Sequence, residues 1–482
     1  MYKKAVLKDR PSLLNAHRIP INQIRSQITG LEKQVPLINR GSRPYINFDN
    51  AATTPSFKSV IEKVAKFSEW YASVHRGTGF KSQLSTHIYE NCREKVMQFV
   101  GADTKDHVAI FTSNTTCAIN NVCQHIELKD NEVILVTIVE HHSNMLPWRV
   151  NCPVEYVDMF DSEGNFSSKK LEEKLRTSQK KVRLVAITGA SNVTGCIPPI
   201  KEVSRVVHNY GAELLVDAAQ LIACRPVEML SLDSPERIDY LVFSAHKMYA
   251  PFGVGVIVGP RKTFISGRPY MVGGGTVDLV TLDDIEWTDA PERDEPGTPN
   301  LIGVVALIEA IDALRKIGWD FIVEHNRFLT KKLLEELRKL PKITIYGKCD
   351  PDCSVDRAGV VTFNAQGISH ALLAAILGYE WGIGVRNGCF CAQPYVIKLL
   401  GLDQAAVRNY AEQIREGDWS TVPGMVRASF GIYNTEEEID YFIEALTSIL
   451  NNGTQVSYTV NPQTGEYSPE GKTPDFNQYF SV

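Results

Sequence analysis

Lys247 is placed where a lysine could hold an aldehyde. It follows the apolar segment 240–243 and precedes the glycine-rich run 251–255. A lysine amine forms a Schiff base when burial or neighbouring charge lowers its pKa, and pyridoxal phosphate is the common aldehyde cofactor that needs one. Most lysines after strands are solvated surface groups, so this interpretation depends on what the other strand ends supply.

Four other apolar segments also end in polar residues. Segment 108–111 leads into Ser113, Thr115 and Thr116 at the start of a helical stretch, and hydroxyls beside the free N–H groups of a helix N-terminus bind phosphate. Segment 214–216 ends on Asp217, a carboxylate that suits a pyridinium nitrogen. Segments 133–136 and 184–187 lead to polar runs in the same way. Together these strand ends could form one cofactor site.

Helical segments lie between the apolar ones, for example 200–207, which Pro198 and Pro199 open and Gly211 closes. Alternating strands and helices predict an α/β fold with a mainly parallel, doubly wound sheet. Ligands of such sheets bind outside the carboxyl ends of the strands, where all these polar residues fall. We therefore expect them to meet at one edge of the sheet.

Ordered motifs along residues 45–450 resemble those of a known family. The chain resembles the fold type I pyridoxal phosphate enzymes of the class V aminotransferase superfamily, and within it the cysteine desulfurases related to selenocysteine lyases. The fold expected is a large cofactor domain with a smaller α+β domain after it. The resemblance rests on the motifs at 48–52, 74–77, 140–142, 191–193, 217–220, 244–247, 273–275, 296–300 and 426–429.

The resemblance assigns roles around the cofactor. Lys247 would bind pyridoxal phosphate and move the substrate's Cα proton, and Asp217 would keep the pyridine nitrogen protonated. His141 would stack on the ring and would belong, with Lys247 and Cys391, to the catalytic residues. The remaining cofactor contacts would come from two groups: Asn192 and Gln220 at the ring hydroxyl, and Thr115, Thr116, Ser244 and His246 at the phosphate.

The resemblance also implies a substrate site and a homodimer. Arg427, with Asn192, would take the substrate carboxylate as a two-pronged pair, although an arginine on a strand edge is often an ordinary salt-bridge partner. Thr298 would reach the phosphate bound by the neighbouring subunit. His75 and His142 are interpreted as structural hydrogen-bonding residues, and Asp49 as a turn former.

The loop 385–394 decides the reaction type. Cys391 matches the cysteine that attacks the substrate's sulfur in the desulfurases, which would leave a persulfide on Cys391 and release alanine. Arg386 could lower the pKa of its thiol. The run 388–391 also resembles the desulfurase-like domain of molybdenum cofactor sulfurases, and Cys389 could relay the persulfide. A helical insertion around 403–413 is expected to cover the site or to receive a partner.

Composition limits the alternatives. A net charge of −5, from 51 basic and 56 acidic side chains, argues against a general nucleic-acid binder. The uncharged run 358–379 fits a strand and a core helix better than a membrane span, and residues 1–8 predict no secretory signal. The scattered cysteines indicate a reducing cytoplasm. Two short pairs, Cys349 with Cys353 and Cys389 with Cys391, could bind zinc, but we expect no metal.

The chain divides into four parts: a leading segment (1–44), a large cofactor domain (45–316), a small domain with the cysteine loop (317–450), and a tail (451–482) that predicts a hairpin.

Three functions fit these observations. The first is a pyridoxal phosphate-dependent cysteine desulfurase acting on L-cysteine, with L-selenocysteine as a further candidate, and passing sulfur to an acceptor protein. The second is another class V enzyme, an aminotransferase, epimerase or C–S lyase, in which Cys391 is incidental. The third is a sulfur-trafficking scaffold that is slow until a partner binds.

Overall fold

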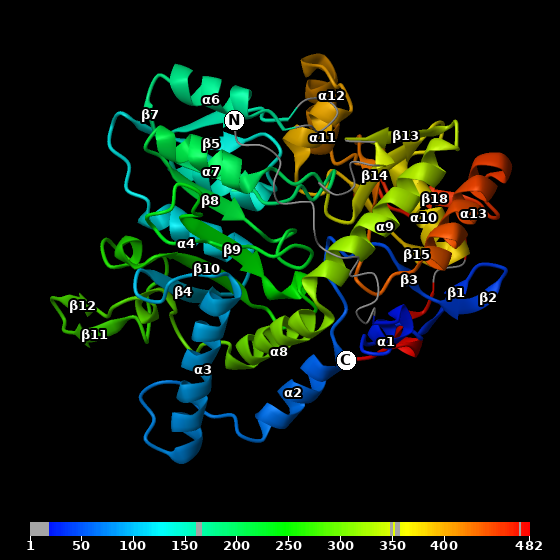
Figure 1. Ribbon diagram of the computed structural model, residues 1–482. Helices are drawn as coiled ribbons and strands as arrows, with labels where there is room; N and C mark the ends of the chain where they lie inside the picture. Colours follow the sequence, from blue (N-terminus) through cyan, green and yellow to red (C-terminus); the bar gives the residue numbers. More distant parts are fainter. Residues whose placement is uncertain (1–18, 161–165, 348–349, 352–356, 472–473) are drawn as a thin grey trace, which may run out of the picture.

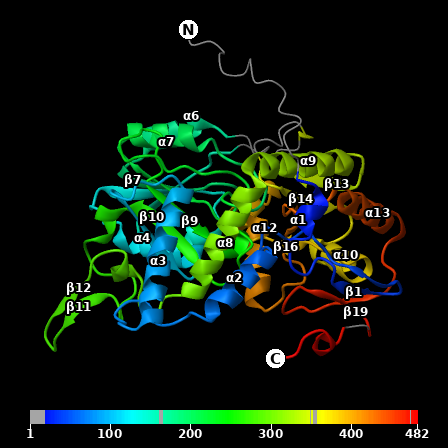
Figure 2. The same ribbon diagram turned by 60° about the horizontal axis from the view of Figure 1, so that its bottom comes forward.

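The structure is a computed structural model that describes residues 19–160, 166–347, 350–351, 357–471 and 474–482 (Figure 1). The expectation about residues 1–8 and the pair Cys349 and Cys353 lie outside these residues. Two domains lie side by side, each built on its own sheet, and the second view agrees (Figure 2).

The large domain is built on a seven-stranded sheet in the order β4-β10-β9-β8-β7-β5-β6. Only β10 runs antiparallel to its neighbours, so the other six strands end at one edge. This confirms the mainly parallel sheet. The strands are β4 (His107–Thr112), β5 (Glu132–Thr137), β6 (Val154–Val157), β7 (Lys181–Thr188), β8 (Glu213–Asp217), β9 (Tyr240–Ser244) and β10 (Gly255–Pro260).

Both faces of this sheet are buried. Along β5, Val133 and Leu135 belong to one apolar core, whereas Ile134 and Val136 belong to another. Successive residues of a strand point to opposite faces, and a parallel sheet needs helices on both, which explains the continuous apolar runs. The helices of this domain are α2 (Lys58–Ser68), α3 (Phe80–Phe99), α4 (Thr115–His125), α5 (Leu146–Asn151), α6 (Ser168–Thr177), α7 (Ile200–Asn209) and α8 (Leu301–Ile317).

The small domain is built on an antiparallel sheet in the order β13-β14-β17-β16. Its core contains Leu333, Phe363 and Leu446, and Phe48 from the start of the chain joins it. The segment 358–379 forms a strand and a helix, as predicted. The elements are β13 (Ile343–Tyr346), β14 (Val360–Ala365), β16 (Arg386–Gly388), β17 (Met425–Ser429), α9 (Trp319–Arg338), α10 (His370–Trp381) and α13 (Glu436–Asn452), with the pair β3 (Ile46–Asn47) and β15 (Ile383–Gly384) beside them.

Several further helices and hairpins lie outside the two main sheets. The insertion after the cysteine loop contains the predicted helix, α12 (Gln404–Arg415), which follows α11 (Gln393–Leu399). The tail forms the predicted hairpin from β18 (Tyr458–Val460) and β19 (Tyr467–Pro469). A second hairpin, β11 (Val277–Val280) with β12 (Ile285–Trp287), projects from the large domain (Figure 1). The first elements are α1 (Ile21–Arg25), β1 (Gln34–Leu37) and β2 (Gly41–Pro44).

Among the described residues, no helix combines the length and the apolar character that crossing a membrane would require.

Candidate active site

A cavity of about 660 Å³ opens where the carboxyl edge of the large sheet faces the small domain. Every predicted site residue except Thr298 lines it: Thr115, Thr116, His141, Asn192, Asp217, Gln220, Ser244, His246, Lys247, Cys391 and Arg427. Thr298 is exposed and borders a different cavity beside Tyr270. Its predicted role requires a second subunit and stays a prediction.

Lys247 ends the short 3₁₀ turn Ala245–Lys247 that follows β9. Burial lowers the pKa of its amine to about 8, while the charges of Asp217 and of a Cys391 thiolate oppose that effect. A lysine with this pKa has a substantial neutral fraction near pH 8, and the neutral amine is the form that attacks an aldehyde. A lowered pKa was the condition for the predicted Schiff base, and the structure shows that burial causes it.

Asp217 is the last residue of β8 and is only 4% exposed. Burial raises the pKa of its carboxyl, although the backbone N–H of Ala219 donates to Oδ1 at 3.0 Å and Lys247 adds an opposing charge. A carboxylate in this position is stabilised further by a cationic partner inside the cavity. A protonated ring nitrogen would be such a partner.

Hydroxyl groups gather at the N-terminus of α4. Oγ of Ser244 lies 2.6 Å from Oγ1 of Thr115 and accepts the backbone N–H of Thr115 at 2.8 Å. Oγ1 of Thr116 lies 2.6 Å from Oγ of Ser143. These hydroxyls and the helix end form a cup for an anion. Ser143 was not among the predicted site residues, although it lies in the polar run that follows segment 133–136.

The cup depends on a close approach between β10 and the start of α4. A Cβ atom added to Gly255 would lie 2.4 Å from the carbonyl carbon of Asn114. Asn114 caps α4, because its Oδ1 accepts the N–H of Cys117 at 2.9 Å. Only glycine therefore lets β10 pass this cap without displacing it.

Glu140 holds the segment that carries His141. It is fully buried and accepts hydrogen bonds from the side chains of Thr137 and Asn144 and from the N–H of Thr188. Burial raises its pKa to about 8. The bonds tie the ends of β5 and β7 to the turn His142–Asn144. The sequence included Glu140 in a motif but gave it no role.

His141 is neutral in this site. Burial and the nearby charge of Lys247 lower its pKa to about 4. Its Nδ1 accepts the N–H of Ser143 at 3.1 Å and lies 2.9 Å from the hydroxyl of Ser143. The ring is thus fixed in orientation at the wall of the cavity, as a stacking role requires.

Asn192, Gln220 and His246 contact other parts of the protein. Nδ2 of Asn192 donates to the carbonyl oxygen of Phe390 at 2.6 Å, and Nε2 of Gln220 donates to that of Ala51 at 2.6 Å. Burial lowers the pKa of His246 to about 4. The two amides thereby join the large domain to the cysteine loop and to the start of the fold.

Arg427 lies on β17 and is 3% exposed. One terminal nitrogen donates to Oδ1 of Asp49 at 2.9 Å and the other to the carbonyl oxygen of Asn192 at 3.0 Å. Its Nε is buried without a partner among the described residues. Arg427 is therefore a buried cation at the cavity, and Asp49 is its counter-ion rather than only a turn former.

The cysteine loop reaches the cavity from the small domain. Cys391 is exposed, whereas Cys389 is half-buried and burial raises the pKa of its thiol. Phe390 and Cys391 have φ angles of 53° and 54°. This left-handed conformation costs about 1–2 kcal/mol for each non-glycine residue, so the surroundings must hold the loop. Arg386 was predicted to lie near the thiol; its Nη1 lies 3.9 Å from Oδ2 of Asp49.

The insertion and the tail complete the mouth of the cavity. Trp419, Thr464, Gly465 and Glu466 are among its lining residues. The N–H of Trp419 donates to the carbonyl oxygen of Pro462 at 2.6 Å. Gly465 has a φ of +70°, and a Cβ there would lie 2.7 Å from the oxygen of Trp419. The sequence expected the insertion to cover the site or receive a partner, but gave the tail no role there.

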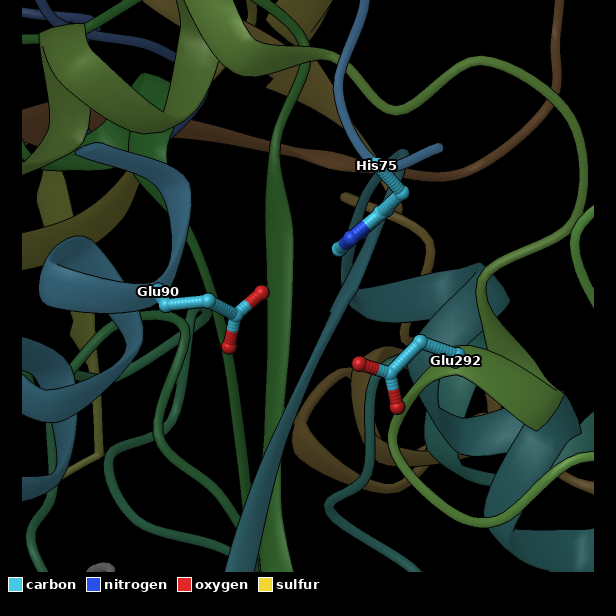
Figure 3. Close-up of side chains that lie close together, drawn as sticks. All are labelled: His75, Glu90 and Glu292. Carbon is cyan, nitrogen blue, oxygen red and sulfur yellow. The ribbon is translucent and has the colours of Figure 1, made fainter. Parts of the chain in front are cut away.

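A separate cluster offers ligand atoms for a cation. His75, Glu90 and Glu292 have such atoms within 4.8 Å of one another (Figure 3). Histidine and carboxylate groups suit a divalent metal, but Glu90 also pairs with Arg93 at 3.1 Å. We assign no metal to this cluster, which the sequence did not predict and which does not line the main cavity.

The family model for "Aminotransferase class-V" matches residues 46–442. A probable cysteine desulfurase from Halalkalibacterium halodurans is 34% identical over 427 residues, which cover 86% of this chain and 96% of that protein. A cysteine desulfurase from Salmonella dublin is 31% identical over 441 residues, covering 89% and 98%.

Two solved structures of cysteine desulfurases have a similar fold. The apo structure of a cysteine desulfurase from Thermococcus onnurineus NA1 aligns with a TM-score of 0.75 and 33% identity over 90% of this chain and 99% of that one. The S-sulfonic acid form of a cysteine desulfurase from Escherichia coli aligns with a TM-score of 0.72 and 28% identity, again over 90% of this chain and 99% of that one. The expected fold type is therefore confirmed.

Proposed function

Because the chain belongs to the class V aminotransferase family, and within it to the cysteine desulfurases, we propose that it takes sulfur from L-cysteine and holds it as a persulfide on Cys391. One observation carries this proposal beyond the family. The exposed thiol of Cys391 and the buried amine of Lys247 line the same cavity, and they lie close enough for a Cys391 thiolate to affect the pKa of that amine.

The residues present fit pyridoxal phosphate. The hydroxyl cup at α4 suits its phosphate, the buried Asp217 suits its ring nitrogen, and the neutral ring of His141 lies at the same cavity. Asn192, Gln220 and His246 would complete its contacts. When bound, this cofactor stabilises negative charge that develops on carbon atoms of the substrate. Lys247 would hold it covalently.

The substrate would be fixed at its carboxylate and deprotonated at its Cα. Arg427 is buried and already oriented by Asp49, and its Nε has no partner within the part of the chain that the structure describes. The substrate's carboxylate would therefore form a charge-assisted hydrogen bond with Arg427. Asn192 would lie beside it as the second substrate-binding residue. Lys247, whose amine burial gives a pKa of about 8, would act as the general base that moves this proton.

Cys391 would then attack the sulfur atom of the substrate. The bond between Cβ and sulfur breaks, a sulfur–sulfur bond forms, and protons replace sulfur on the carbon skeleton, which leaves as alanine. L-cysteine and one thiol become alanine and one persulfide, so this step needs no external oxidant. Thiolates are the reactive form, and exposed Cys391 is better suited than Cys389, whose pKa burial raises.

Four finer points belong to the same proposal. The enzyme would work as a homodimer, with Thr298 reaching the partner's phosphate site. It would pass sulfur to an acceptor protein, accept L-selenocysteine as well, and act in the cytoplasm. The exposed position of Thr298, outside its own chain's cavity, supports the first point.

The decisive experiment compares Cys391→Ser with Cys389→Ser. Both variants should bind cofactor and exchange the Cα proton of L-cysteine with solvent, because those steps need Lys247 and not a thiol. Only Cys391→Ser should stop producing alanine. Alkylation and mass spectrometry should locate the persulfide on Cys391 in the wild type and in Cys389→Ser. Undiminished alanine production by both variants would refute the mechanism.

A further inference from the structure

His142 contacts the cysteine loop twice, at Cys391 and just after it. Its backbone N–H donates to the carbonyl oxygen of Cys391 at 2.6 Å. Its Nε2 accepts the backbone N–H of Gln393 at 3.2 Å. Both bonds come from one residue of the large domain and hold the C-terminal side of Cys391 in the other domain. His142 itself does not line the cavity.

The second bond fixes the chemical form of the ring. A backbone N–H can only donate, so Nε2 must carry a lone pair and the ring proton must reside on Nδ1. Burial lowers the pKa of His142, which favours this neutral form. The side chain of His142 thus supplies the acceptor for the N–H of Gln393. The bond to Cys391 comes from the backbone of His142, so it remains when the side chain is substituted.

The loop needs such contacts because its backbone is strained. Phe390 and Cys391 are consecutive non-glycine residues with positive φ. Strained residues persist only where their surroundings over-determine them. Asn192 holds the carbonyl of Phe390 at 2.6 Å, and His142 holds the next carbonyl and the N–H two residues later.

The two neighbours of His142 in the sequence both belong to the cavity. His141 lines the cavity, and Ser143 orients the ring of His141 and belongs to the hydroxyl cup. We propose that His142 is a positioning residue for sulfur transfer: its Nε2 holds the Cys391 loop in register with the His141 side of the substrate pocket. This inference rests on the proposed function and deepens it.

The test uses His142→Phe, which keeps a ring and removes the acceptor, and His142→Gln, whose side-chain oxygen restores an acceptor. His142→Phe should lower kcat for alanine formation about tenfold, as expected when a donor loses its partner. The KM for L-cysteine and the rate of Cα proton exchange should not change, because Arg427 and Lys247 govern them. His142→Gln should recover most of kcat.

Amide hydrogen exchange of the apoenzyme provides a readout that needs no cofactor. The peptide spanning 389–395 should exchange about tenfold faster in His142→Phe and near the wild-type rate in His142→Gln. His325→Phe is the control, because it removes a comparable bond from a histidine ring to the carbonyl of Asn434, at 2.9 Å, in the small domain. It should leave exchange in 389–395 unchanged.

Wild-type kcat and exchange in His142→Phe would overturn the proposal. So would a His142→Gln variant as slow as His142→Phe, because the acceptor atom would then not be what His142 supplies. Equal losses of proton exchange and sulfur transfer would likewise overturn it. If the wild type formed no alanine, the proposed function would fail, whereas the exchange experiment would still decide whether Nε2 tethers the loop.

Discussion

The pH at which Lys247 becomes reactive tests the electrostatics of the cavity. Burial lowers the pKa of its amine from 10.5 to about 8. This difference corresponds to roughly 3 kcal/mol in favour of the neutral form. At pH 7 about one molecule in ten would carry a neutral Lys247, against about one in 3,000 for an ordinary lysine. The apoenzyme should therefore capture pyridoxal phosphate readily near neutrality.

The assay follows the absorption band of the lysine-bound cofactor after apoenzyme and pyridoxal phosphate are mixed between pH 6 and 10. The rate should rise about tenfold per pH unit below pH 8 and level off above it, because the amine is then already neutral. A free lysine derivative in the same buffers corrects for titration of the cofactor itself. A rate that still rises tenfold between pH 9 and 10 would refute the depressed pKa.

Three further predictions follow from single contacts. Asp217→Asn should retain bound cofactor but lose most alanine formation, because an amide cannot hold the ring nitrogen protonated; near-normal turnover would contradict its role. Asp49→Asn should lower the free energy of unfolding by about 1–3 kcal/mol in urea titrations, because buried Arg427 loses its counter-charge; unchanged stability would show that Arg427 needs none. Gly465→Ala should speed the alkylation of Cys391 by bulky maleimides, because a Cβ there collides with Trp419; Gly471→Ala, with positive φ but open space, is the control, and equal rates in both variants would argue against the tail as a wall.

The sequence was sufficient for residues that follow strands directly. Asp217 and Lys247 could be placed because apolar runs locate the strand ends and parallel topology collects those ends at one edge. The helix of the insertion and the hairpin of the tail could also be predicted from the sequence, because turn residues and periodicity are local signals.

The missed contacts join positions far apart in the chain. Asp49 pairs with Arg427 across 378 positions, and His142 contacts Gln393 across 251. No local pattern distinguishes such a carboxylate from a turn former, or tells which distant backbone group a structural histidine will bind. A single signal was available for Ser143, a hydroxyl residue within a polar run after a strand. The contact of the tail with Trp419 depends on the tertiary fold alone.

The lining of the cavity extends from Ala51 to Glu466 of a chain of 482 residues. During synthesis the large sheet and its core can form while later residues are still being added, since domains generally fold as units from the N-terminus. The wall that the tail contributes is synthesised after the rest of the lining. A nascent chain therefore presents Lys247 and the hydroxyl cup before it has Cys391, the insertion or the tail. Sulfur transfer in this enzyme is thus confined to chains whose synthesis has passed Cys391, because shorter ones lack the thiol that would carry it out.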